Sequence, residues 1–287
     1  MTGFRRYIVV GCTVVCLVAA VPAGAGTLKC PPDSVKVGNV CIDTYEASVW
    51  QIPPSNIALV KLVQAGKATL AQLTGGGAIL LAPAATCHDP TDYGANFPST
   101  GNWTPVPGSN PPSPGVYAVS IPGVQPSACI TWFQANEACA LSGKRLVRND
   151  EWQRAAASTP DPGTDNGTTD CNVDSSPGPV STGSRSSCKS AWGVFDMVGN
   201  VGEWVADWGD ANPLNCTDWT TTAGIPGNDI SCFGGPGGVG PFGNISIPGA
   251  LTRGGAYFFG TSAGVFAVKA SRFPSDSDYD NGFRCAR

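Results

Sequence analysis

The chain has 287 residues, of which 42% are hydrophobic and only 13% are charged. This apolar share excludes an intrinsically disordered chain and can fill the core of one large domain or two small ones. The 37 glycines and 25 prolines, together with the absence of a long helical pattern, favour a loop-rich domain over a helical bundle. The net charge is −4 and the basic residues are not clustered, so nucleic acid and anionic membranes are poor partners.

The first 25 residues have the pattern of a secretory signal peptide. Two arginines precede an apolar run over residues 7–20, and a small-residue cleavage signal ends at Ala25. The apolar run is too short for a comfortable membrane span. We therefore expect cleavage after about Ala25 and a secreted, extracytoplasmic domain over residues 26–287.

Cys12 offers a second interpretation of the same segment. The run from Val9 to Cys12 resembles a bacterial lipobox, and a lipid on Cys12 would anchor the protein to a membrane. Few apolar residues precede this cysteine, and the apolar run continues beyond it. The sequence therefore favours cleavage and export over a lipid anchor.

Twelve cysteines are present, and two of them, Cys12 and Cys16, lie in the signal segment. The remaining even number, in an exported and loop-rich domain, predicts a disulfide framework. Zinc is a poor alternative, because the chain has no C-x-x-C pair and its single histidine is His88. Spacing does not fix connectivity, but closeness in sequence favours three local disulfides: Cys30–Cys41, Cys171–Cys188 and Cys216–Cys232.

The start of the domain is predicted to form a β-hairpin. Cys30 and Cys41 bracket a Pro-Pro turn and a Val-rich strand, and a second strand begins at Cys41. Strands at the two ends of a domain often pair, which would bring Cys285 close to this early element.

The composition changes over about residues 52–128, which we interpret as an insertion rich in proline and glycine. Apolar residues recur at helical spacing over residues 56–73 and predict one or two short helices. The later part of the segment is dominated by Pro, Gly, Ser and Thr. We expect it to be an ordered loop, because Cys87 and Cys129 could hold it in place.

The clearest helical segment follows Thr131. Ser142 and Gly143 are a suitable C-terminal stop for this helix. Four residues are predicted to form its apolar stripe: Phe133, Ala135, Ala138 and Cys139.

A second helix is predicted to begin near Asn149, a good N-cap residue. Asp150 and Glu151 follow in the first turn, where the helix dipole favours acidic side chains. The helix is expected to end at Thr159-Pro160. Its core face is predicted to contain Trp152, Ala155 and Ala156.

Residues 196–208, DMVGNVGEWVADW, have the densest chemical pattern in the chain. A glycine-bearing loop with a carboxylate on each side lets carbonyl and carboxylate oxygens converge, as hard cations such as Ca²⁺ require. A tight turn between two core tryptophans is an equally good interpretation of these residues alone. The loop is too rich in glycine for a helix.

Five segments, in this order, resemble the formylglycine-generating-enzyme family, also called the sulfatase-modifying-factor domain: CIDTYEAS, TWFQANEACALSGKRLVRNDEWQRAA, GVFDMVGNVGEWVADW, LTRGGAY and NGFRC. The resemblance covers most of residues 41–287, apart from the insertion at about 52–128. It implies a single, loop-rich α+β domain with the family's variant of the C-type-lectin fold, stabilised by disulfides.

The resemblance also implies a structural calcium ion in the loop. The matching ligands are the side chains of Asp196 and Glu203 and the backbone carbonyls of Gly199 and Val201. The start of a second family calcium site matches only Asn172, so no second ion is expected.

Cys139 and Cys285 match a disulfide found in members of the family. Together with the local pairs, this leaves Cys87 and Cys129 for each other. With these two pairs added to the three local disulfides, no free thiol remains in the domain.

Enzymes of the family oxidise a sulfatase cysteine to formylglycine with O₂ and a Cu(I) ion held by two cysteines, as suits a soft metal. The matching positions, six and eleven residues after Arg253, are Phe259 and Gly264, and no cysteine lies between Cys232 and Cys285. Copper is therefore not expected. We expect a non-catalytic member of the family, and the alternative is a formylglycine-generating oxidase.

The segment 257–279 lies where the family has its active-site groove. Its aromatic residues could form a surface that binds a peptide, a glycan or a partner protein. The alternative is that alternate residues of this segment simply fill the core. The candidate groove residues are Tyr257, Phe258, Phe259, Phe266 and Phe273.

Overall fold

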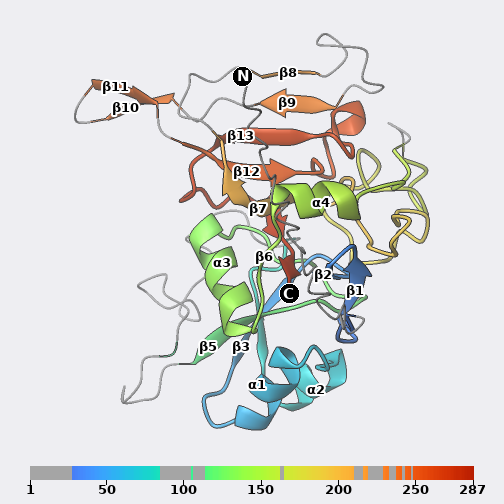
Figure 1. Cartoon of the computed structure of the whole chain (residues 1–287), viewed down its shortest axis with the longest axis vertical. Coiled ribbons are helices and arrows are strands. Elements are labelled where there is room, and N and C mark those ends of the chain that lie inside the picture. Colours follow the sequence, from blue (N-terminus) through green and yellow to red (C-terminus); the bar gives the residue numbers. More distant parts are fainter. Residues whose placement is uncertain are drawn as a thin grey trace, which may run out of the picture.

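Figure 1 shows a computed structural model, which describes residues 28–84, 105, 114–161, 165–209, 216–218, 229–232, 237–240, 243–246 and 248–287. The predicted signal segment, Cys12 and Cys87 lie outside these residues. A six-stranded sheet lies at one end of the long axis, and a three-stranded sheet with two helices lies at the other. No helix in the described part of the chain is long and apolar enough to cross a membrane.

The predicted N-terminal hairpin is confirmed, and it joins the C-terminus. Strands β1 (Ser34–Val37) and β2 (Val40–Asp43) pair antiparallel across a two-residue turn, in which Gly38 has a φ of 63°. Strand β15 (Cys285–Ala286) lies between β2 and β6 (Arg145–Leu146). The first hairpin and the last strand of the domain therefore pair as predicted.

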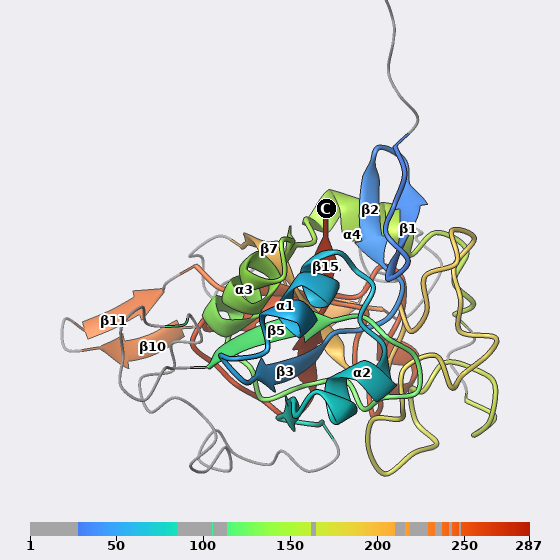
Figure 2. The same cartoon turned by 90° about the horizontal axis from the view of Figure 1, so that it is seen from below.

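Residues 48–81 and 115–119 form a unit of their own at the lower end of Figure 1. Helices α1 (Ile57–Gln64) and α2 (Leu70–Gly75) confirm the two short helices predicted for residues 56–73. Leu59, Val63 and Leu73 are buried on these helices and belong to one cluster with Trp50 and Tyr117. Figure 2 shows both helices covering the strands of this unit, which are β3 (Ser48–Ile52), β4 (Ile79–Leu81) and β5 (Gly115–Val119).

Helix α3 (Trp132–Leu141) follows Thr131, which forms a capping box with Gln134. The predicted end is confirmed, since Ser142 is the C-cap and Gly143 has a φ of 68°. Ala135, Ala138 and Cys139 are fully buried as predicted.

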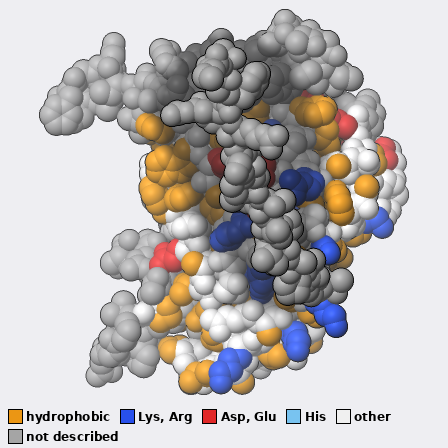
Figure 3. Space-filling model, viewed as in Figure 1, with side chains coloured by type: hydrophobic (Ala, Val, Ile, Leu, Met, Phe, Trp, Pro, Cys, Tyr) orange, Lys and Arg blue, Asp and Glu red, His pale blue; other side chains and the backbone are white. Residues whose placement is uncertain are grey.

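Phe133 was wrongly assigned to the apolar stripe of α3, because it is 53% exposed. At about 100° per residue, Phe133 lies roughly 200° around the helix from Ala135, and so on the opposite face. Its ring makes edge contacts with Trp132 and Trp208. Figure 3 shows hydrophobic side chains gathered on the side of the molecule where α3 lies.

Helix α4 (Asn149–Ala155) begins near Asn149 as predicted, but its N-cap is Arg148, one residue earlier than the predicted Asn149, which is already helical. Glu151 accepts from the backbone N–H of Arg148 at 3.0 Å and pairs with Arg145 at 2.6 Å. The helix also ends earlier than the predicted Thr159-Pro160. Its core face is confirmed, since Trp152, Ala155 and Ala156 are fully buried.

The six-stranded sheet has the order β14-β7-β12-β13-β9-β8. Strand β12 stops at Arg253, earlier than the strand predicted from LTRGGAYFF, because Gly254 and Gly255 take φ values of 85° and 79°. Strands β10 (Gly237–Gly240) and β11 (Gly243–Ser246) form a hairpin beside this sheet. The six strands are β14 (Asn281–Phe283), β7 (Gly202–Trp208), β12 (Ala250–Arg253), β13 (Val268–Arg272), β9 (Ile230–Cys232) and β8 (Cys216–Asp218).

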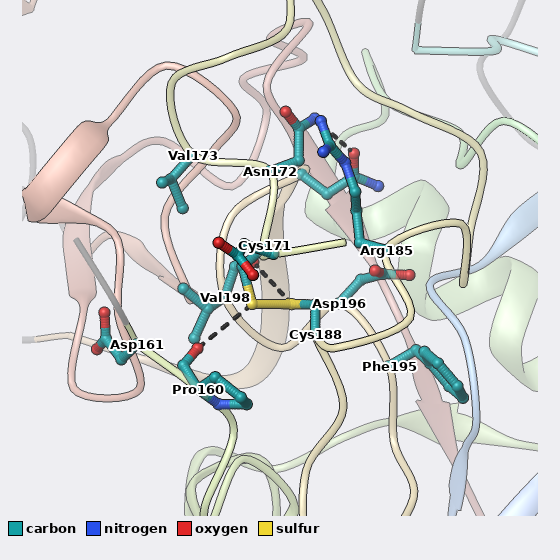
Figure 4. Close-up of a disulfide and its surroundings, with 12 residues drawn as sticks. Pro160, Asp161, Cys171, Asn172, Val173, Arg185, Cys188, Phe195, Asp196 and Val198 are labelled. Carbon is teal, nitrogen blue, oxygen red and sulfur yellow. Dashed lines mark hydrogen bonds between the residues drawn. A yellow bond between two sulfur atoms is a disulfide. The ribbon is translucent and has the colours of Figure 1, made fainter. Parts of the chain in front are cut away.

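Three of the predicted disulfides are confirmed: Cys30–Cys41, Cys139–Cys285 and Cys171–Cys188. Figure 4 shows the last of these, with Asp196 on one side and Asp161 on the other. Cys129 and Cys232 are also disulfide-bonded, but their pairing with Cys87 and Cys216 stays a prediction. The register places Cys216 directly opposite Cys232 in strands β8 and β9.

Candidate functional site

The loop that precedes β7 makes a sharp, strained turn. Asp196, Gly199 and Asn200 all have φ values between 58° and 73°, a region that L-residues seldom adopt. A Cβ on Gly199 would stand 2.2 Å from the carbonyl oxygen of Asn172, so this position requires glycine. A tight turn is therefore present, and it directs Asp196 into the protein, where the side chain is buried. It does not lie between two core tryptophans, because Trp204 and Trp208 both follow it in β7 and Trp208 is 45% exposed.

Glu203, at the start of β7, forms a buried ion pair with Arg284. The Arg284 Nη2 and Nε atoms lie 2.5 and 2.7 Å from the two carboxylate oxygens. The indole Nε1 of Trp152 also donates to Glu203, at 2.8 Å. Burial alone would lower the pKa of Arg284, but the adjacent Glu203 carboxylate outweighs burial and raises it.

Glu46, just before β3, anchors the loop from the other side. Its carboxylate accepts from the side chain of Asn200 at 2.5 Å and from the backbone N–H of Val201 at 3.1 Å. Burial, together with the charges of Asp196 and Glu203, raises the pKa of Glu46 well above its usual value. The sequence analysis missed Glu46, and its place inside the CIDTYEAS motif was the only available signal.

Asp196 is the third buried acid of this cluster. It accepts from the backbone N–H of Gly183 at 2.7 Å, and burial raises its pKa to about 7. Glu46, Asp196 and Glu203 together carry three negative charges when ionised, and the one positive charge of Arg284 acts on all three. The raised pKa values mean that Glu46 and Asp196 hold protons in the absence of a cation, and a divalent cation that displaced these protons would balance the ionised acids.

The four predicted calcium ligands differ in their availability. No three His, Cys, Asp or Glu side chains converge on a metal position in the described residues, so a cation here would depend on Asp196, Glu203 and the carbonyls of Gly199 and Val201. Glu203 would have to share its oxygens with Arg284. The donor set is all oxygen, which fits Ca²⁺ in kind.

Phe259 and Gly264, which match the copper-binding cysteines of the family, have different surroundings. The half-buried ring of Phe259 lies under the ammonium group of Lys269, 5.0 Å from its centroid. Gly264 is buried, and a Cβ placed on it would stand 2.2 Å from Oδ1 of Asp229. The Asp229 carboxylate thus fills the space that a side chain at residue 264 would need.

Two carboxylates and an arginine fix the backbone of residues 264–267. Asp229 accepts from the N–H of Phe266 at 2.7 Å, and Asp161 accepts from the N–H of Val265 at 3.2 Å. Arg253 donates to the carbonyl of Ala267 at 2.7 Å. Burial, reinforced by Asp161, raises the pKa of Asp229 to about 6, and burial lowers the pKa of Arg253 to about 10.

The predicted groove residues are exposed or half-buried, and Phe259 packs against a buried cluster that includes Ala263. Phe258 and Phe266 are 45% and 38% exposed, and the other three are half-buried. The rings of Tyr257, Phe258 and Phe259 contact one another in sequence. Tyr279, which the sequence analysis did not select, extends this row through Phe258 at 6.0 Å. Small residues of the same segment fill the core instead, namely Ala263, Ala267 and Ala270.

A small pocket of about 10 Å³, which has room for about one water molecule, opens beside Phe259. Its polar lining consists mainly of Lys269, Asp280 and Asn281, none of which the sequence analysis selected. Burial lowers the pKa of Lys269. Gly202, between the predicted calcium ligands Val201 and Glu203, also lines the pocket. The loop of the predicted calcium ligands and the predicted groove therefore adjoin each other.

Comparison with known families agrees with this arrangement. Residues 21–287 match the model of the sulfatase-modifying factor enzyme 1-like domain. The chain belongs to this family. Its α+β architecture is the C-type-lectin-like fold that the resemblance implied.

Individual relatives of this sulfatase-modifying-factor domain are distant. The formylglycine-generating enzyme of Thermomonospora curvata is 27% identical over 280 residues, which cover 89% of this chain and 84% of that protein. Among solved structures, the Major Tropism Determinant M1 variant has a TM-score of 0.42 at 17% identity and covers 89% of this chain. PvdO from Pseudomonas aeruginosa has a TM-score of 0.37 at 18% identity, over 86% of this chain and 80% of its own. The chain spans about half the length of the tropism determinant, 52%.

Proposed function

We propose that this protein is an exported, non-catalytic member of its family, which binds a ligand through the groove formed by residues 257–279. The observation that carries the proposal is the contact between Asp229 and Gly264. A copper site of the family type needs a thiolate at residue 264, and the Asp229 carboxylate takes up the space for its Cβ. Carboxylates are also poor ligands for Cu(I).

Binding is supported by the groove itself. Phe258 and Tyr279 expose 45% and 42% of their surface beside the pocket, and large exposed aromatic residues are typical of contact surfaces. The alternative function is a formylglycine-generating oxidase, which the relative from Thermomonospora curvata favours. Fold and family alone do not carry an activity across when the residues of the site differ.

Calcium is proposed as a structural cofactor of this scaffold. Asp196 and Glu203 would supply carboxylate oxygens, and Gly199 and Val201 would supply backbone carbonyls. The three buried acids around Arg284, two of which have raised pKa values, support this assignment. Export is supported by the three disulfides, which persist in oxidising compartments.

Copper binding tests the proposal. The exported protein is titrated with Cu(I) in competition with a chromogenic chelator, under a non-thiol reductant that leaves the disulfides intact. We expect no stoichiometric binding by the natural protein. The triple variant Phe259→Cys, Gly264→Cys and Asp229→Gly, which restores both thiolates and clears the space, is expected to bind one copper ion. Stoichiometric binding by the natural protein would refute the proposal.

A further inference from the structure

A second pocket, of about 170 Å³, lies between helix α1 and the ends of strands β3 and β5; we call it the α1 pocket. An apolar cavity of about 150 Å³ holds a benzene molecule, so the α1 pocket has room for a single aromatic ring with a short substituent. The unit that contains it and the six-stranded sheet lie at opposite ends of the long axis in Figure 1. The α1 pocket is therefore separate from the groove of residues 257–279.

The α1 pocket exists because a glycine stands at the start of β5. Gly115 pairs with Ile52 of β3, and Tyr117 pairs with Trp50 two positions away. Side chains alternate across a strand, so Gly115 faces the same side of the sheet as Tyr117. Ile52, Trp50 and Tyr117 pack into one cluster with residues of α1 and α2. The space that a side chain on residue 115 would fill on this side of the sheet is left open.

The walls of the α1 pocket are apolar. They come from the end of β3 and the two residues after it, from the first turn of α1 and from both ends of the segment that leads to β5. None of the described residues that line the pocket is charged. Such walls offer few hydrogen bonds to water, which favours an apolar occupant. Besides Gly115 and Tyr117, the lining residues are Ile52, Pro53, Pro54, Ile57, Val60 and Pro105.

The hydroxyl group of Tyr117 adds one polar side-chain group to these walls. It lies 2.7 Å, and Cγ of Pro105 lies 2.8 Å, from the point where Gly115 would carry a Cβ. Tyr117 is only 7% exposed, and its hydroxyl has no hydrogen-bond partner in the described part of the chain. Burial raises the pKa of Tyr117, so the hydroxyl stays neutral and can both donate and accept. A ligand with one polar group could supply the partner that this hydroxyl needs.

We propose that the α1 pocket binds a small phenol, a single aromatic ring that carries one hydroxyl group. The ring would lie against the proline and isoleucine side chains, and its hydroxyl would form a hydrogen bond with Tyr117. This site is independent of the groove of residues 257–279 and of the proposed calcium ion.

Other classes of ligand fit the α1 pocket less well. A charged ligand would be buried without a charged partner among the described lining residues. A sugar would leave all but one of its hydroxyl groups unpaired. A drug-sized molecule is too large, because such ligands occupy pockets of about 300–1,000 Å³.

The test compares p-cresol with toluene, which has the same ring and methyl group but no hydroxyl. Binding of each compound to the protein is measured by saturation-transfer NMR and by calorimetry. We expect p-cresol to bind in a saturable way, with a Kd of about 1 mM or lower. Tyr117→Phe is expected to weaken the binding of p-cresol about tenfold, as the loss of one hydrogen bond would, and to leave the binding of toluene unchanged.

A second variant, Gly115→Ala, tests the pocket itself. Its Cβ would fill part of the space and stand 2.7 Å from the Tyr117 hydroxyl, so it should weaken the binding of both compounds. The matched control is Leu70→Ala, which shortens an exposed apolar side chain on α2 that does not line the pocket and should bind both compounds as the natural protein does. Melting curves show whether each variant is folded.

The assignment is overturned if the natural protein shows no saturable binding of p-cresol. It is equally overturned if the Tyr117→Phe variant binds p-cresol as tightly as the natural protein does, or if this substitution weakens the binding of toluene as much as that of p-cresol.

Discussion

Oδ1 of Asp229 lies 2.2 Å from the point where Gly264 would carry a Cβ. The two residues lie 35 positions apart in sequence. The Asp229 carboxylate occupies the space that a side chain on residue 264 would need. Asp229 also accepts from the N–H of Phe266, so the same carboxylate holds the segment that would otherwise carry a metal ligand. The groove is therefore built without space for the second thiolate.

Gly264→Ala should destabilise the protein by about 1–3 kcal/mol, the usual cost of overpacking a filled site. The new methyl group would push the Asp229 carboxylate off its backbone donors. Urea unfolding measures the loss. The double variant Gly264→Ala/Asp229→Gly should be more stable than the sum of the single effects, because the clash is gone. Gly178→Ala is the control, since its Cβ meets nothing within 4 Å; a Gly264→Ala variant as stable as this control would contradict the contact.

The stability contributed by Asp229 should depend on pH. Burial raises the folded-state pKa of Asp229 from 3.8 to about 6, so the folded state holds the proton more tightly than the unfolded state. This group therefore adds stability as the pH falls from 7 to 4, by at most about 3 kcal/mol. The measurement is the unfolding free energy of the natural protein minus that of Asp229→Asn, which should rise as the pH falls. A difference that stays constant over this range would contradict the pKa assignment.

Removal of calcium should lower the melting temperature. A ligand present at one hundred times its Kd stabilises a protein by about 2.7 kcal/mol, so a chelator should produce a clear shift in a thermal melt. Asp196→Ala should abolish the response to the chelator. Glu203→Ala is a less specific test, because it would also leave Arg284 buried without its partner.

The control for calcium is Asp174→Asn, an exposed acid in the same part of the chain. It should respond to the chelator as the natural protein does. Identical melting curves with calcium and with chelator in the natural protein would refute the calcium site.

Thiol titration should find no free cysteine in the exported protein after denaturation without reduction. Three disulfides join pairs of described residues, Cys129 and Cys232 are also disulfide-bonded, and the predicted pairs Cys87–Cys129 and Cys216–Cys232 would account for the remaining cysteines. Mass spectrometry of unreduced peptides checks the pairing. Two or more free thiols, or Cys129 linked to a partner other than Cys87, would contradict the framework.

Local patterns in the sequence predicted local structure well. Thr131 and Gly143 bound helix α3 because caps are set by residues next to the helix ends. The Cys30–Cys41 hairpin is equally local. Helical spacing already places Phe133 opposite Ala135, but its ring contact with Trp208 of β7 could not be seen from the sequence.

The candidate site was predictable only in part. The loop from Asp196 to Glu203 was selected from its own composition, but its partners lie far away in the sequence. Arg284 is 81 residues from Glu203, and Glu46 is 154 residues from Asn200. Such pairs depend on strand order, which no short-range pattern encodes.

The same limit applies to the pocket. Asp280 and Asn281 precede Gly282, and this pattern indicates only a turn in the sequence. Strand β14, which begins at Asn281, pairs with β7 and places Asn281 opposite Gly202. Only this pairing shows that the two polar side chains share a pocket with Phe259.

The central claim is that the protein does not catalyse formylglycine formation. The most direct measurement is oxygen uptake by the exported protein with a sulfatase-type cysteine peptide, Cu(I) and a non-thiol reductant. The formylglycine-generating enzyme of Thermomonospora curvata serves as the positive control. We predict the same oxygen uptake as in the protein-free reaction and no aldehyde in the peptide. Protein-dependent oxygen uptake with matching conversion of the cysteine to formylglycine would contradict the account.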